Sequence, residues 1–175
     1  MKKIAIVCGG YSGEYEISIN SAKVVKEHLD PNKYESYIIV IQRDSWYYFD
    51  GNDKVCEVDR NDFSIMKGDI KITFDAVFNA IHGIPGEDGE LLGYFDMLKI
   101  PYTSSGFTTS AVTFHKEFCK TLAGAYGANI SPSVTLRKDD RYDVNEIADT
   151  LGLPVFVKPV CNGSSVGVSK VNTME

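Results

Sequence analysis

The stretch HGIPGEDGELLG, residues 82–93, decides how the rest of the chain is interpreted. The apolar run at residues 76–81 leads straight into it, and a short continuous run bounded by turn residues predicts a strand buried on both faces. Turn-forming residues follow too densely for a regular element: Gly83, Pro85, Gly86 and Gly89. Apolar residues then recur at helical spacing, at Leu91, Tyr94, Phe95 and Leu98. The stretch therefore predicts a strand, a glycine-rich turn and a helix.

The turn lies where open α/β sheets bind ligands, at the carboxyl end of a buried strand. Glu87 and Asp88 fall where the helix should begin, a place where acidic residues interact favourably with the helix dipole. His82 ends the predicted strand, and we expect it to point into the same crevice. A purely structural explanation also fits, with the acids in the first helical turn and the histidine hydrogen-bonded to the turn.

The first residues predict a second unit of the same kind. Residues 4–8 form an apolar run, glycines follow at residues 9–13, and a helical pattern extends to Asp30 and Pro31. A further run at residues 37–41 completes a strand–helix–strand unit, which predicts a right-handed parallel pair. The spacing lacks the GxGxxG and Gly-Lys-Ser/Thr patterns, which argues against a dinucleotide fold and a P-loop. By itself the glycine turn also fits a plain tight connection.

The middle of the chain predicts hairpins and then a change of domain. Residues 46–51 indicate a short hairpin arm, and two apolar runs around residues 67–69 indicate another, covering a sheet edge or contacting a second copy. A helical stretch begins at Thr108 and continues through residues 114–126, with Gly127 as its C-cap. We expect the domains to be residues 1–108 and 109–175. The second is predicted to hold strands at residues 132–136 and 154–159 and a helix at residues 144–151.

A second informative stretch is VKPVCNGSSVG, residues 157–167. Lys158 ends an apolar strand, and a lysine there is costly to bury unless an anion pairs with it. The following loop of glycines and serines offers backbone N–H groups and hydroxyls, which are the groups that wrap a phosphate. A flexible hairpin tip beside an exposed lysine is the alternative.

Composition excludes several classes of protein. The net charge of −6 and the lack of a basic cluster argue against nucleic-acid binding. Four cysteines without a CxxC pair indicate reduced thiols in a cytoplasmic protein. No apolar stretch is long enough to span a membrane, and the run after Lys2 and Lys3 is too short for a signal peptide.

Residues 82–89 resemble the N-terminal signature of the D-alanine–D-alanine ligases, which reads HG, two variable residues and GEDG. Leu92 departs from the family, which usually has Gln or a small residue there. The VKP strand and GSSVG loop also look like the nucleotide-binding strand and phosphate-covering loop of the ATP-grasp fold. The resemblance implies an α/β fold, with a Rossmann-like parallel-sheet (pre-ATP-grasp) domain followed by a truncated ATP-grasp central subdomain.

The resemblance also implies roles for residues on the substrate side. Glu14 matches the glutamate that holds the ammonium group of the first D-alanine, and Glu16 is the neighbour most easily confused with it. His82 would lie near the substrate carboxylate and the acyl phosphate. In the family, the first loop serine, here Ser164, helps to orient the glutamate and so shares its catalytic role.

Other implied roles concern ATP. The residues implied to bind it are Lys116, Lys158, Ser164, Ser165 and Gly167, with the two lysines on the phosphates and the rest forming a lid. A solvated helical lysine is the alternative for Lys116. Asn162 stands where some family members have a glutamate, which leaves any acid role at this position open.

The implied function is the ATP-dependent joining of two D-alanines, through an acyl phosphate, for peptidoglycan precursors. Adenine contacts, a catalytic arginine and the Mg²⁺ ligands are expected in a second half, so no metal ligand is expected here. The chain alone is expected to be inactive, and the family suggests a homodimer through the first domain. Two alternatives stay open: a ligase that joins D-alanine to D-serine or D-lactate, and a non-catalytic α/β binding or dimerisation module.

Overall fold

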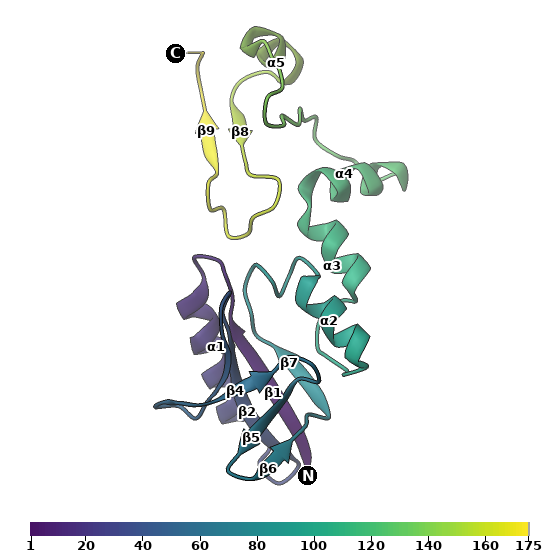
Figure 1. Cartoon of the computed structure of the whole chain (residues 1–175). Coiled ribbons are helices and arrows are strands. Elements are labelled where there is room, and N and C mark those ends of the chain that lie inside the picture. Colours follow the sequence, from purple (N-terminus) through teal and green to yellow (C-terminus); the bar gives the residue numbers. More distant parts are fainter. Residues whose placement is uncertain (175) are drawn as a thin grey trace. The chain divides into compact units, whose positions relative to one another are not determined.

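Figure 1 shows the chain as a computed structural model, which describes residues 1–174. The chain divides into two compact units, Met1–Ala111 and Val112 onward. This division falls a few residues after the one expected from the sequence, at residue 108. No helix in the described residues is both long and apolar enough to cross a lipid bilayer.

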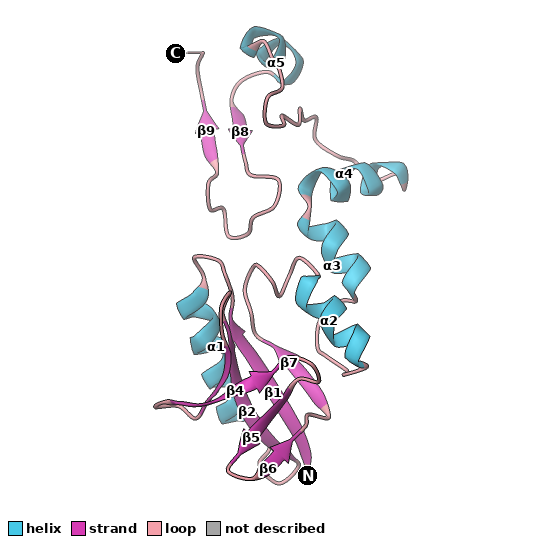
Figure 2. Cartoon of the chain, viewed as in Figure 1, coloured by secondary structure: helices cyan, strands magenta, loops and turns pink. Residues whose placement is uncertain are grey.

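A seven-stranded sheet forms the middle of the first unit (Figure 2). Across the sheet the order is β6 (Ile70–Ile72), β5 (Ser64–Lys67), β4 (Lys54–Asp59), β3 (Trp46–Phe49), β2 (Tyr34–Ile41), β1 (Lys2–Gly9) and β7 (Ala76–Asn79). Strand β1 is parallel to both β2 and β7, and every other pair is antiparallel. The parallel part agrees with the expected α/β class. The predicted hairpin arms are antiparallel strands that extend this sheet beyond β2.

Helices cover both faces of the parallel part. Strand β1 alternates between two cores, with Ala5 and Val7 in one and Ile6 and Cys8 in the other. Helix α1 (Tyr15–His28) supplies Ala22 to the second core, and α2 (Glu90–Leu98) supplies its apolar face to the first. A strand buried on both faces is continuously apolar, which explains the run that the sequence shows.

Aromatic rings fill the core between α2 and the antiparallel strands. Phe63 lies at the centre, with ring centroids 4.9 Å from Phe95, 6.0 Å from Tyr94 and 6.3 Å from Trp46. These are the edge-to-face arrangements that aromatic pairs favour, each contributing about 0.5–1.5 kcal/mol beyond the buried area. The aromatic residues of this region therefore serve packing.

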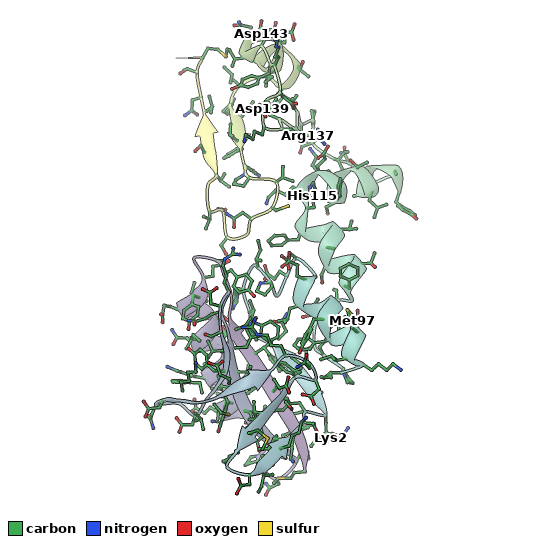
Figure 3. All side chains as sticks on the ribbon, viewed as in Figure 1. Lys2, Met97, His115, Arg137, Asp139 and Asp143 are labelled. Carbon is green, nitrogen blue, oxygen red and sulfur yellow. The ribbon has the colours of Figure 1, made fainter. Side chains whose placement is uncertain are left out.

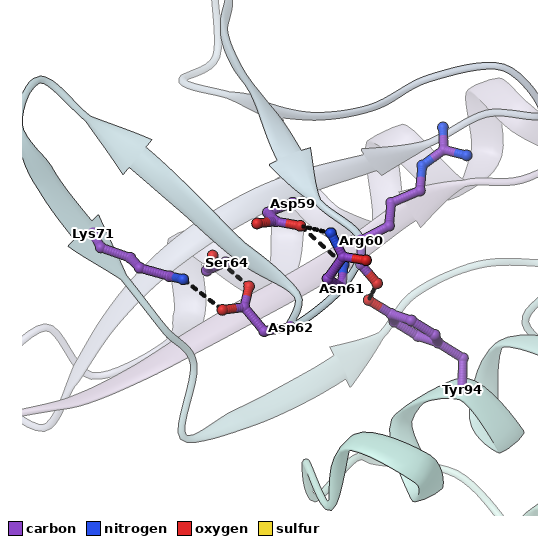
Figure 4. Close-up of polar contacts among 7 residues, drawn as sticks. All are labelled: Asp59, Arg60, Asn61, Asp62, Ser64, Lys71 and Tyr94. Carbon is purple, nitrogen blue, oxygen red and sulfur yellow. Dashed lines mark hydrogen bonds and ion pairs between the residues drawn. The ribbon is translucent and has the colours of Figure 1, made fainter.

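Polar contacts fix the turn between β4 and β5 above this core (Figure 4). The Tyr94 hydroxyl donates to the carbonyl of Arg60 at 2.8 Å, and the Ser64 hydroxyl donates to Asp62 at 2.6 Å. Lys71 forms an ion pair with Asp62, and its hydrogen bond lowers the pKa of that carboxyl group. The turn is thus tied both to α2 and to β6.

The second unit contains short elements with an irregular segment between them. Helix α3 (Phe107–Phe114) runs across the division, and α4 (Lys116–Ala125), α5 (Val144–Leu151), β8 (Val155–Val157) and β9 (Ser169–Val171) follow. Strands β8 and β9 pair antiparallel. The sequence predicted one helical stretch from Thr108, but His115 is extended and breaks it, and its Nδ1 accepts from the N–H of Phe118 at 3.4 Å (Figure 3).

The strand predicted at residues 132–136 is wrong, because these residues have no strand partner. Side chains of α4 and its surroundings hold the segment instead. Lys120 Nζ donates to the carbonyl of Ser131 at 2.6 Å, and Arg137 binds both carboxylate oxygens of Glu117 at 2.9 and 3.1 Å. The apolar residues of the segment lie exposed rather than in a ladder.

Burial differs sharply between the two units. Every buried residue in the described part of the chain belongs to the first unit, and the last of them is Ser110. The second unit leaves large apolar side chains exposed, including Phe118, Leu122, Tyr142, Val144 and Phe156. Apolar burial is the main stabilising contribution in a folded domain, so the first unit carries most of the stability.

Candidate functional site

Two loops of the first unit emerge at the same edge of the sheet. They follow β1 and β7, which are parallel neighbours, and the carboxyl ends of such strands are where ligands bind. Tyr11 N–H donates to the carbonyl of Ile84 at 2.8 Å, and the Ser12 hydroxyl donates to the carbonyl of His82 at 2.9 Å. These bonds join the two loops directly.

Close packing around Ile81 also joins these loops. A Cβ atom on Gly10 would lie 2.8 Å from the Ile81 side chain, and one on Gly86 would lie 2.6 Å from its Cβ. Gly10 also has a φ of +92°, a conformation that other residues rarely adopt. Both positions therefore require glycine, and the apolar side chain between them fixes the separation of the loops.

A buried serine of α1 connects the two strand ends. The Ser18 hydroxyl accepts from the N–H of Gly9 at 2.9 Å and donates to the carbonyl of Ala80 at 2.8 Å, with no exposed surface. The sequence analysis did not identify this residue. The available signal was a serine one turn before Ala22 on the apolar face of the helix.

The residues expected to bind the first D-alanine lie on these loops. Glu14 is the N-cap residue of α1, and one of its carboxylate oxygens lies 3.6 Å from the position that a Cβ on Gly83 would take. His82 follows β7 rather than ending it, and its Nε2 lies 3.1 Å from the hydroxyl oxygen of Ser21. The structure therefore brings Glu14 to the residue next to His82. Glu16 lies exposed in the first turn of α1.

The acids of the GEDG sequence have structural partners. Asp88 Oδ1 accepts from the N–H of Glu90 at 3.1 Å, at the start of α2, and burial raises the pKa of Asp88. Glu87 N–H donates to the carbonyl of Gly83 at 2.8 Å, and its side chain is exposed. The geometry thus favours the structural explanation for Asp88 as a residue that caps the helix.

Asn79 holds the glycine-rich turn that follows β7. The sequence analysis did not identify this residue. Its Nδ2 donates to the carbonyl of Gly86 at 2.8 Å, and its Oδ1 accepts from the N–H of Ile81 at 3.1 Å. The N–H of Asn79 donates to the Thr103 hydroxyl at 3.0 Å. The last residue of β7 therefore holds both the glycine-rich turn and a segment beyond α2.

A pocket of about 320 Å³ lies within the second unit. Its lining includes four of the residues expected to bind ATP, namely Lys116, Lys158, Ser164 and Ser165. Small-molecule sites typically have volumes of roughly 300–1,000 Å³, so the pocket suits part of a nucleotide. Gly167 belongs to the same loop with a φ of +74°, and a Cβ there would lie 2.9 Å from the Pro159 ring.

The pocket carries positive charge without carboxylate partners. Lys116 Nζ donates to the carbonyl of Asn162 at 2.6 Å and to that of Val160 at 3.4 Å. Lys158 Nζ lies 5.5 Å from the centre of the Phe156 ring. Within residues 1–174 neither ammonium group forms an ion pair with an acid. An anion in the pocket would therefore meet two cations that are not neutralised.

The loop between β8 and β9 has an irregular backbone. Ser164 and Ser165 have φ angles of 45° and 57°, and the N–H of Val166 donates to the carbonyl of Gly163 at 3.0 Å. Successive turn conformations of this kind make concave surfaces of N–H groups that bind anions. The assignment of this loop to phosphate binding stays a prediction.

The described residues contain no evident metal-binding site. Residues 1–174 contain no group of three or more His, Cys, Asp or Glu side chains placed to hold one. The donor groups of the described residues therefore do not fit a Mg²⁺ ion.

Comparison with known proteins identifies the family. Residues 3–105 match the D-ala D-ala ligase N-terminus family, and residues 122–175 match the D-ala D-ala ligase C-terminus family. The chain belongs to the D-alanine–D-alanine ligases. It is 47% identical over 173 residues to the ligase of Flavobacterium johnsoniae, covering 99% of this chain and 54% of that protein. The chain thus spans about half the length of the curated relatives it matches.

Solved ligase structures share the fold. The D-alanine–D-alanine ligase of Coxiella burnetii matches with a TM-score of 0.86 and 32% identity, covering 99% of this chain and 57% of that one. The VanG D-Ala:D-Ser ligase of Enterococcus faecalis matches with a TM-score of 0.82 and 33% identity, over 97% and 55%. A Bacillus anthracis ligase in complex with ATP matches with a TM-score of 0.75 and 26% identity, over 99% and 51%. These matches confirm the expected family and fold.

Proposed function

We propose that this chain forms the part of an ATP-dependent D-alanine–D-alanine ligase that holds the first D-alanine and the ATP phosphates. The supporting observation is the pocket of the second unit, where Lys116 and Lys158 meet a glycine–serine loop and form no ion pair with an acid among residues 1–174. The ligase in complex with ATP among the similar structures agrees with a nucleotide as the ligand. The protein would supply dipeptide for peptidoglycan precursors in the cytoplasm.

On the substrate side, Glu14 accepts hydrogen bonds from the ammonium group of the first D-alanine. A charge-assisted bond of this kind is about twice as strong as a neutral one. His82 lies near the substrate carboxylate, and its contact with Ser21 holds the imidazole ring in place. Both residues lie on loops fixed by Ser12 and Ile81, so the site is formed before substrate binds.

On the nucleotide side, Lys116 and Lys158 bind phosphate oxygens. Ser164, Ser165 and Gly167 cover the phosphates, with hydroxyl and N–H groups as donors. Ser164 also orients Glu14 in this proposal. Lys116 Nζ has three N–H donors, so it can bind a phosphate oxygen and keep its contacts with the carbonyls of Asn162 and Val160.

The reaction then proceeds in two steps. An oxygen of the first D-alanine carboxylate attacks the γ-phosphorus of ATP, and ADP leaves with the bonding electrons, which gives an acyl phosphate. The neutral amine of the second D-alanine attacks the acyl carbon, phosphate leaves from the tetrahedral intermediate, and the amine loses a proton. Donors fixed beforehand around the developing negative charge lower both barriers. Mg²⁺ belongs to the proposal for the whole enzyme, but no step is assigned to it on these residues.

Dimerisation through the first unit is also part of the proposal. Helix α1 exposes Ile17 and Val24, which lie two turns apart on one side of the helix with 55% and 56% of their surfaces accessible. Sedimentation of the chain at increasing concentration measures the oligomeric state, with Ile17→Lys as the variant expected to remain monomeric.

A D-alanine–D-serine ligase is the second candidate, favoured by the similarity to VanG. Substrate competition separates the two candidates. ADP release by the full-length enzyme is measured with D-alanine alone and with D-alanine plus D-serine, and faster release on adding D-serine would favour the second.

The central test replaces the carboxylate that is proposed to bind the substrate. In the full-length enzyme, Glu14→Gln should raise the KM for the first D-alanine by about 10-fold or more, because it loses a charge-assisted bond of about 1.5–3 kcal/mol. Glu16→Gln is the matched control, and its KM should be unchanged. An unchanged KM in Glu14→Gln would contradict the assignment. D-alanine-dependent ADP release by the 175-residue chain alone would contradict its expected inactivity.

A further inference from the structure

We propose that Asn162 is a positioning residue that shapes the phosphate loop and keeps the charge of Lys116 available to the ligand. The inference rests on the proposed function, because it concerns the same pocket. Asn162 lines that pocket and lies directly before Gly163, the first residue of the loop.

Each polar group of Asn162 except its N–H has a defined partner. Its carbonyl oxygen accepts from Lys116 Nζ at 2.6 Å, and its Oδ1 accepts from the N–H of Gly163 at 3.0 Å. Its Nδ2 donates to the carbonyl of Val166 at 3.3 Å. The side chain therefore acts as acceptor and donor at once, on opposite sides of the turn. A carboxylate in this position has no hydrogen to donate to Val166.

These bonds support a left-handed backbone conformation that residues other than glycine rarely adopt. Ser164 and Ser165, which lie between the two partners of the amide, have φ angles of 45° and 57°. A left-handed conformation is unfavourable for a residue with a side chain. The bridge from Asn162 across the turn offsets that cost and fixes the shape before a ligand arrives.

The neutral amide of Asn162 also leaves the positive charge of the pocket unchanged. Lys116 is held by carbonyl oxygens, which orient the ammonium group and leave its charge intact. A carboxylate at residue 162 would add a negative charge to the lining of the pocket that Lys116 also lines, and it would repel a phosphate. The asparagine therefore makes the pocket more favourable for a polyanion than the glutamate of some family members.

The experiment measures anion binding by the 175-residue chain itself. Sodium tripolyphosphate and ATP are titrated separately, and the amide signals of Gly163 and Gly167 are followed by NMR at low and high salt. Asn162→Ala removes both side-chain bonds, whereas Asn162→Asp keeps an acceptor, loses the donor and adds a negative charge. Asn172→Asp is the control, because it makes the same charge change at an exposed residue just beyond β9.

We expect Asn162→Ala to weaken tripolyphosphate binding about fivefold at any salt concentration, as hydrogen bonds are lost. Asn162→Asp should weaken it at least about tenfold at low salt and by less at high salt, because salt screens the added charge. Asn172→Asp should stay within about twofold of the wild type, because the Debye length is near 8 Å at physiological salt.

Each other outcome overturns the inference in a recognisable way. Unchanged affinity in both Asn162 variants contradicts it while leaving the phosphate site intact. Equal losses in the two variants without salt dependence would assign Asn162 a role in folding alone, which also contradicts it. No shift in the wild-type chain on adding tripolyphosphate would overturn the phosphate site and this inference together.

Discussion

Replacing Ser18 with alanine tests how the first unit holds its two ligand-side loops. The substitution leaves the N–H of Gly9 and the carbonyl of Ala80 without a partner, and both bonds are buried. Each unsatisfied buried group costs about 1–3 kcal/mol. The better helix propensity of alanine returns about 0.5 kcal/mol. We therefore expect the free energy of unfolding to fall by about 3 kcal/mol.

The single tryptophan makes the assay specific for the first unit. Trp46 lies in the aromatic core and is 9% exposed, so its fluorescence reports the unfolding of that unit. With an m-value of about 2 kcal/mol/M in urea, the midpoint of Ser18→Ala should fall by about 1.5 M. Asn20→Ala, at an exposed position of the same helix, is the matched control and should leave the midpoint nearly unchanged.

A midpoint within about 0.3 M of the wild type would refute the argument, because at that m-value the loss would be below about 0.6 kcal/mol. The two buried groups would then have found other partners. An unchanged m-value is also expected, since the substitution alters the stability and not the area exposed on unfolding.

Three further predictions concern titration, reactivity and exchange. Burial raises the pKa of Asp88, so the stability it contributes is complete below its unfolded pKa and is lost as the pH rises through the folded value. Asp88→Asn should therefore raise the urea midpoint at pH 7 and leave it unchanged in acid, and a lower midpoint at pH 7 would contradict this. Burial raises the pKa of Cys8 to about 12, so Ellman's reagent should modify the exposed Cys161 in the native chain and Cys8 only after unfolding. Because residues 112–174 include no buried side chain, amides of β1 should exchange with deuterium far more slowly than those of β9, and equal rates would contradict the uneven burial.

The parallel part of the fold was readable from the sequence because its signals are local. Residues 4–8 and 37–41 are continuously apolar, and a strand covered on both faces needs that composition. Helix α5 was predicted with its observed bounds and ends at Gly152, as expected. In each case the signals for the element and for its ends lie in the same short stretch of sequence.

Other elements depend on partners that local sequence does not reveal. Residues 132–136 have a strand-like composition, yet they pair with no strand, and Lys120 holds the segment through the Ser131 carbonyl and the Ser133 hydroxyl. Strand β4 escaped the analysis because three of its six residues are charged and interrupt the apolar run. Its inward alternation of Cys56 and Val58 was the signal that could have identified it.

The candidate site likewise contains residues that the sequence identified and residues that it did not. Lys116, Lys158 and the loop serines were named from motifs, and the structure places them around one pocket. Ser18 and Asn79 were missed, because their roles are hydrogen bonds to residues far away in the chain. A buried polar side chain becomes meaningful only when its partner is known.

The position of Ile81 between Gly10 and Gly86 has a consequence for how the sequence can change over time. The three residues share one small volume: a Cβ on Gly86 would lie 2.6 Å from the Cβ of Ile81, and one on Gly10 would lie 2.8 Å from both the Ile81 side chain and the Ile84 carbonyl oxygen. Changes at one loop therefore constrain the other, although the loops are distant in the sequence. Among homologues we expect both glycines to be retained together with a residue at position 81 that fits between them, as one heritable element made of two separate segments.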